Sequence, residues 1–182
     1  MPKREAESEP VDEPAAKKAK TTKPEYTFNF NKAVDKAQEV KTFTDLKALP
    51  PSALQGLTER GDVVFAKVKI QTIEDLGRWK YYHIAKAIKT LAETEEEGAR
   101  NPEGDANLNS ALDKEWETKT FNEMLNAPIS ALQGLGDWVD GAFKELRPAP
   151  KTIGELADWK YCHWAEAITT LSLYETEDHS SR

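Results

Sequence analysis

Cysteine is nearly absent from this sequence, which holds one, Cys162, among 182 residues. A single thiol cannot build a disulfide framework, so we expect a reducing compartment. Long apolar runs are missing too, and no window approaches the roughly 18 apolar residues of a membrane-spanning helix. The opening residues, MPKREAESEP, have no apolar run after their charges, so we expect no secretory signal. These absences predict a protein that neither spans a membrane nor enters the secretory route.

Sequence signatures of catalysis are also missing. There is no G-x-S-x-G, no P-loop and no dinucleotide-binding fingerprint. His83 and His163 each follow a Trp by four residues, but with one cysteine in the chain they do not supply the about four ligands of a zinc site. Cys162 and His163 are adjacent in sequence, which turns their side chains about 100° apart on a helix. We expect no enzymatic activity, no catalytic residues, no metal and no cofactor.

A calcium loop is the one metal site that the spacing imitates. The stretch 105–113 carries side-chain oxygens at alternate positions, followed by a later carboxylate, as such loops do. Ser110 stands where the sharp turn needs Gly, and Trp116 stands where the bidentate Glu belongs. The pattern therefore favours a shared helix start over a calcium site.

Charge divides the chain into two parts. Residues 1–27 contain six Lys or Arg and six Asp or Glu, so the other 19 basic and 26 acidic residues carry the whole net charge of -7. Binding to nucleic acid depends on Lys and Arg neutralising phosphates. An acidic folded part therefore disfavours nucleic acid as its partner, whereas the tail remains compatible with it.

The tail, residues 1–27, is predicted to be disordered, because it has four of the ten prolines and almost no large apolar side chain. Two basic clusters within it resemble a bipartite nuclear localisation signal, which a nuclear import receptor would bind. The alternative is a solvated tail that only keeps the protein soluble, in which case the protein is cytoplasmic. The residues of the predicted import signal are Lys3, Arg4, Lys17, Lys18 and Lys20.

An internal repeat dominates the rest of the chain. The stretch from Thr72 to Leu91, TIEDLGRWKYYHIAKAIKTL, recurs as TIGELADWKYCHWAEAITTL from Thr152 to Leu171, with 12 of 20 positions identical. Upstream, residues 29–57 align without gaps on residues 107–135, with 16 of 29 positions identical. One unit of about 65 residues, which is the size of a small domain, has therefore been used twice.

The cues inside each unit are helical. Four Thr residues are each followed three positions later by Asp or Glu, which is the spacing of a capping box, and the last stretch of each unit has apolar residues at helical intervals. We predict an all-α protein in which the last, longer amphipathic helix of each unit buries that unit's core. The predicted organisation is a disordered tail (1–27), helical module 1 (28–92), an acidic linker (93–106), helical module 2 (107–174) and a C-terminal tail (175–182).

Two stretches of each unit resemble the helix-hairpin-helix class of modules. Leu54-Gln55-Gly56-Leu57 followed by Ile70 to Leu76, and Leu132 to Gly136 followed by Thr152 to Leu156, are similar to the glycine hairpin and following turn of that family. In the family the hairpin amides commonly hold a DNA phosphate. Only the second copy keeps the Gly-hydrophobic-Gly form, in Gly134 and Gly136, while carboxylates follow both hairpins. The resemblance therefore implies the fold more strongly than binding to DNA.

Aromatic and basic residues supply a candidate partner surface. Trp79-Lys80 and Trp159-Lys160 open the last helix of each unit, where the Trp rings can anchor the core or, if exposed, bind a partner. Trp138 has no aromatic counterpart in the first unit, where Arg60 takes its place. The candidate surface comprises Trp79, Lys80, Trp138, Trp159 and Lys160.

The sequence thus predicts a non-enzymatic protein-binding or scaffold protein, nuclear in location, whose modules recognise protein partners or pack against each other. The partner's identity does not follow from it. The alternative is a nucleic-acid-associated factor that uses the basic tail and the hairpin of Gly134, Leu135 and Gly136.

Overall fold

The computed structural model describes residues 28–101 and 103–176, and in these ranges the regular elements are all helices, with isolated β-bridges but no strand. The prediction of an all-α fold is confirmed. The first half (residues 28–92) contains η1 (Lys36–Gln38), α1 (Phe43–Lys47), η2 (Pro51–Ala53), α2 (Glu59–Lys67), α3 (Ile73–Gly77) and α4 (Lys80–Ala92), where η marks a 3-10 helix. The second half (residues 107–174) contains α5 (Phe121–Leu125), η3 (Ile129–Ala131), α6 (Trp138–Phe143), α7 (Ile153–Ala157) and α8 (Lys160–Leu171).

Threonine side chains cap four of these short helices, as the spacing predicts. In each case the hydroxyl accepts a hydrogen bond from the backbone N–H three residues later, which satisfies a donor that the first helical turn leaves unpaired. The caps of α3 and α5 are complete capping boxes, in which Asp75 and Glu123 also accept from the backbone N–H of the capping Thr. Local sequence is thus sufficient to fix where these helices begin.

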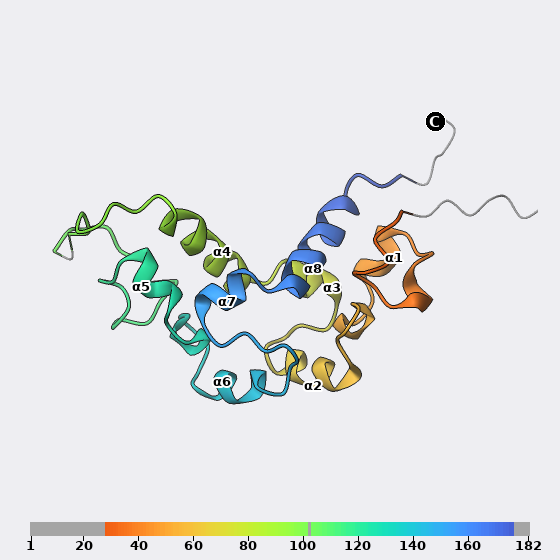
Figure 1. Cartoon of the computed structure of the whole chain (residues 1–182). Coiled ribbons are helices and arrows are strands. Elements are labelled where there is room, and N and C mark those ends of the chain that lie inside the picture. The colour runs from red at the N-terminus through yellow and green to blue at the C-terminus, as the bar shows by residue number, and fades with distance from the viewer. Residues whose placement is uncertain (1–27, 102, 177–182) are drawn as a thin grey trace, which may run out of the picture.

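The last helix of each half, called here the closing helix, packs on the opposite half. The closing helix of the second half, α8, lies against α3 and α1, whereas that of the first half, α4, lies against α7 and α5 (Figure 1). The expectation that each closing helix buries its own unit's core is therefore wrong. Because the halves share most of their core residues, either one presents a suitable apolar face to either closing helix, and tertiary contacts decide between them.

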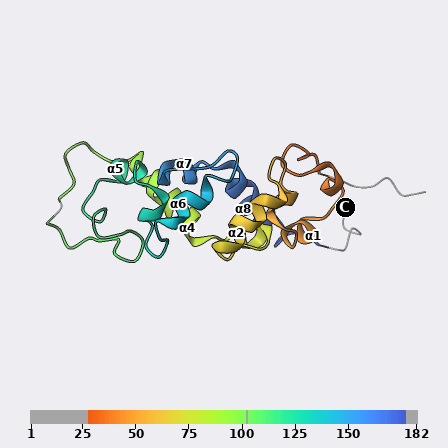
Figure 2. The ribbon, with the colours of Figure 1, turned by 90° about the horizontal axis from the view of Figure 1, so that it is seen from below.

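Exchange of the closing helices merges the two predicted cores. The buried apolar residues of both halves belong to one continuous cluster, which runs from Val34 to Ile168. Seen from below, the molecule is elongated, with α1 near one end, α5 near the other, and α2 and α6 between them (Figure 2). The two repeat units still correspond to residues 28–92 and 107–174, but neither half buries its core alone.

Two glutamates that follow the closing helices also bind to the opposite half. Glu95, at the start of the predicted linker, accepts hydrogen bonds from the backbone N–H groups of Phe121 and Asn122 at the start of α5, at 2.6 and 3.0 Å. Glu175, at the repeat-equivalent position in the predicted C-terminal tail, accepts from Phe43 and Thr44 at the start of α1, at 3.1 and 2.8 Å. Negative charge is favoured at a helix N-terminus, so both residues belong to the fold.

Candidate functional site

The glycine turns at Gly56 and Gly134, called hairpins here, lie against tyrosines of the exchanged helices. Gly56 and Gly134 have φ angles of +98° and +97°, which side-chain-bearing residues rarely adopt. A Cβ atom on Gly56 would lie 2.8 Å from the Tyr161 hydroxyl oxygen, and one on Gly134 would lie 2.8 Å from that of Tyr81. Glycine is therefore required here for both backbone conformation and close approach to the other half.

Trp79 and Trp159 lie in the core, with 6% and 5% of their surface exposed. The Trp159 ring packs against Phe65 of the first half at 5.8 Å between centroids, and the Trp79 ring packs against Phe143 of the second half at 5.9 Å. Burial removes both rings from the candidate partner surface, which is a correction to that prediction. Their function is to join the two halves.

Lys80 and Lys160 remain on the surface, next to tyrosine rings. Lys80 Nζ lies 4.5 Å from the centroid of Tyr81, and Lys160 Nζ lies 4.8 Å from that of Tyr161 and 4.9 Å from that of Trp164. Such cation–π contacts hold the ammonium groups over aromatic faces. Because Tyr81 and Tyr161 reach the hairpins, each of these lysines belongs to the neighbourhood of the opposite half's hairpin.

Trp138 is the exposed aromatic residue of the candidate surface, with half of its surface accessible. It begins α6, and a Cβ on Gly136 would lie 2.9 Å from Trp138 Cδ1, so the indole covers that glycine. In the first half, Arg60 takes the equivalent position and forms an ion pair with Glu145 of the second half at 3.3 Å. The two hairpins therefore present different chemistry.

The carboxylates that follow the hairpins include two with a structural role. Asp62 accepts a hydrogen bond from the backbone N–H of Ser52 at 2.9 Å, and Asp140 accepts from the backbone N–H and the hydroxyl of Ser130 at 3.1 and 2.6 Å. Each aspartate thus ties the 3-10 helix before its hairpin to the α-helix after it. Their presence in both halves is explained without a ligand.

A polar cluster forms where α4 and α8 approach each other. Glu166 of α8 accepts hydrogen bonds from the Tyr82 hydroxyl at 2.7 Å and from Lys86 Nζ at 2.6 Å, both on α4. The Tyr82 hydroxyl also lies 3.2 Å from His163 Nδ1, and His83 Nε2 donates to the Gly77 carbonyl at 2.9 Å. Nearly all of these residues come from the two exchanged helices.

Two pKa shifts describe the electrostatics of this cluster. Partial burial acts to raise the pKa of Glu166, but the hydrogen bonds from Lys86 and Tyr82 outweigh it, so the pKa lies below its ordinary value. Burial, followed by the hydrogen bond to Glu166, raises the pKa of Tyr82 far above its ordinary value. The cluster therefore holds an ionised Glu166 beside a protonated Tyr82 at neutral pH, with Lys86 Nζ as the ion-pair partner of the carboxylate, which suits a structural role.

Cys162 is fully buried, and burial followed by the nearby Glu166 charge raises the pKa of its thiol well above the ordinary value. A buried, protonated thiol is a poor nucleophile. In the described ranges no three His, Cys, Asp or Glu side chains gather as metal ligands. Within those ranges no helix is long and apolar enough to cross a membrane.

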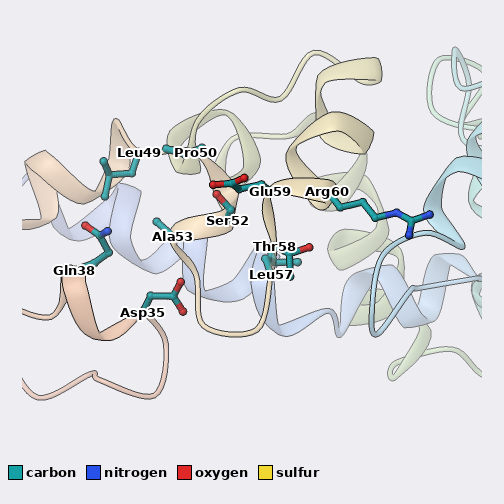
Figure 3. A pocket seen from close by; sticks show the side chains of 10 residues that line it. All are labelled: Asp35, Gln38, Leu49, Pro50, Ser52, Ala53, Leu57, Thr58, Glu59 and Arg60. Carbon is teal, nitrogen blue, oxygen red and sulfur yellow. The ribbon is translucent and has the colours of Figure 1, made fainter.

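An open groove of about 540 Å³ lies beside the start of α2, lined among others by Asp35, Gln38, Glu59 and Arg60 (Figure 3). In that view the Arg60 side chain extends away from Asp35 and Gln38. The labelled side chains come from several segments and do not converge on one point in that view.

Sequence reasoning left open whether the two halves pack against each other, and it missed the exchange of the closing helices. The relevant signal was present, since Lys86 and Glu166 are equivalent positions of the repeat with opposite charges, and Glu95 and Glu175 are equivalent positions with the same charge. The predicted import signal, Lys3, Arg4, Lys17, Lys18 and Lys20, lies outside the described residues.

No protein-family model, no curated protein and no solved structure matches this chain. Fold and contacts define it as an all-α protein in which two repeat halves exchange their closing helices around one core.

Proposed function

We propose that this chain is a non-enzymatic binding or scaffold protein that recognises a protein partner through the hairpin region of its second half. The observation that carries the proposal is the half-exposed indole of Trp138, which lies over Gly136 at the start of α6. Exposed Trp residues are frequent anchors of protein interfaces, because a large ring is desolvated at small entropic cost. The arrangement of Tyr82, Lys86 and Glu166 as an ion-paired cluster supports a binding protein over an enzyme.

Nucleic acid is the alternative partner, bound by the basic tail and the hairpin amides around Gly134 and Gly136. Lys80, which stacks on Tyr81 beside Gly134, favours it. The Trp138 ring over Gly136 and the net charge of -7 oppose it. A salt-dependent shift of duplex DNA that Gly136→Asp abolishes would establish the alternative, and no shift at low salt would remove it.

Replacing Trp138 by Ala should weaken capture of the protein partner by more than about tenfold, because truncation of an interface anchor commonly costs about 2 kcal/mol or more. The measurement is quantitative affinity capture with the tagged full chain, followed by titration of the captured protein. Val63→Ala is the matched control, since Val63 is also exposed and lies on the equivalent helix α2. Equal capture by wild type and the Trp138 variant would contradict the proposal.

The same proposal assigns the protein to the nucleus through its basic tail. Residues 1–26 fused to a fluorescent reporter should accumulate in nuclei, because two basic clusters in an extended chain can occupy two acidic pockets of an import receptor. Replacing Lys17, Lys18 and Lys20 by Ala should make the signal diffuse. A diffuse signal from the unaltered fusion would contradict nuclear import and favour the cytoplasm.

A further inference from the structure

Equivalent residues of the repeat face each other where α4 and α8 approach. Lys86 and Glu166 are separated by the repeat offset of 80 residues, and they form an ion pair at 2.6 Å. In an exchange between two identical halves, the same two positions would therefore be occupied by two lysines or by two glutamates. Two like charges at that distance repel strongly in a partly buried setting, where 43% of the Lys86 side chain and 27% of the Glu166 side chain are exposed.

A second difference concerns the space next to α8. Gly77, the last residue of α3, lies so close to α8 that a Cβ would be 2.6 Å from the Ala165 carbonyl oxygen and 2.7 Å from Thr169 Oγ1. The equivalent residue of the second half is Ala157, at the end of α7, which packs against α4. In a pair of second halves, Ala157 would take the place of Gly77, and its methyl group would enter the space in which α8 approaches α3. In this chain α8 thus approaches α3 more closely than an Ala at this position would allow.

A third difference is in hydrogen bonding. Tyr82 is fully buried on α4, and its hydroxyl donates to Glu166 of α8. The equivalent residue of the second half is Cys162. A pair of second halves would lack both Tyr82 and Lys86, the two donors that compensate the partly buried Glu166 carboxylate. Leaving such a charge without donors is costly.

We propose that the two halves of this chain form a heterospecific pair: each half binds the closing helix of the other half and discriminates against a second copy of itself. The recognition surface comprises α3 and α1 for α8, and α7 and α5 for α4. Lys86, Glu166 and Gly77 carry the discrimination. The linker then supplies proximity, whereas specificity lies in the helices themselves. The proposal is independent of which outside partner the protein recognises.

The test uses the full chain with a protease site inserted at Gly98, where an added Cβ would have no neighbour within 4 Å. After cleavage, native mass spectrometry and size exclusion should show one complex containing one copy of each fragment. Separation of the fragments, or pairs of identical fragments in comparable amounts, would overturn the proposal. This experiment substitutes no residue of either half, so its result does not depend on whether a substituted half folds.

Charge reversal then tests the cause of the selectivity. In the cleaved chain, Lys86→Glu and Glu166→Lys should each weaken association of the fragments by about tenfold or more, since each creates a like-charge pair. The double variant K86E/E166K restores opposite charges and should return the dissociation constant to within about threefold of wild type. The readout is the dissociation constant on dilution, in low and high salt. If the double variant lost as much free energy of association as the two single variants together, the role of this pair would be contradicted.

Discussion

Replacing Gly77 by Ala is expected to lower the free energy of unfolding by about 1–3 kcal/mol or more, the range measured for overpacking a well-packed interior. The added Cβ would lie 2.6 Å from the Ala165 carbonyl oxygen, which is backbone and cannot rotate away. Helix α8 would have to move off α3, and the contacts of α8 with α1 would weaken with it. Urea unfolding followed by far-UV circular dichroism measures the loss.

Gly141→Ala is the matched control for this prediction. Gly141 lies within α6, and a Cβ there would have no neighbour within 4 Å. Since Ala favours a helix over Gly by about 1 kcal/mol, this variant should be as stable as wild type or more stable. If both variants changed stability by the same amount, the effect at Gly77 would reflect helix propensity alone, and the close packing of α3 against α8 would be disproved.

Truncating Trp159 to Ala should cost about 3–5 kcal/mol, the usual loss for a large buried aromatic residue. The ring packs on Phe65 at 5.8 Å and on Phe143 at 6.4 Å between centroids, and its Nε1–H donates to the Pro148 carbonyl at 3.0 Å. One side chain therefore contacts both halves. Its loss leaves a cavity in the shared core and an unpaired carbonyl.

Besides the midpoint, the number of unfolding transitions of the Trp159→Ala variant shows whether the two halves share one core. Because the two halves share one core, the variant should still unfold in a single transition, displaced to lower urea concentration, and the same transition should be seen by circular dichroism and by size exclusion. Trp138→Ala, at an exposed position, should shift the midpoint little. Two separate transitions, one of them with the midpoint of the wild-type chain, would show that the halves fold independently.

The exchange of closing helices changes what the repeat means for function. Trp79 and Trp159, together with their lysines, form the most conspicuous pattern in the sequence and suggest a partner surface. In the structure these indoles are interior, and they are shared between the halves because Phe143 and Phe65 of the opposite half pack against them. The proposed partner surface is consequently reduced to the side of the molecule where the repeats differ, at Trp138.

The helical elements follow from sequence because they depend on local interactions. Thr42, Thr72, Thr120 and Thr152 cap helices through groups three residues away, and the apolar spacing from Tyr81 to Ile88 sets the buried face of α4 within one helix. Such signals need no knowledge of distant residues. The all-α class and the positions of the main helices can therefore be predicted from the amino-acid sequence.

The partner of each closing helix was decided only by tertiary structure. Because the halves repeat the same caps, hairpins and apolar stripe, α4 and α8 would each find a similar apolar surface on either half, and the hydrophobic effect does not distinguish between such surfaces. The choice depends on contacts between residues far apart in the chain: the missing Cβ of Gly77 beside Ala165, and the charge of Lys86 beside Glu166. The sequence determined the two repeated halves, and packing and charge determined that each is completed by the other.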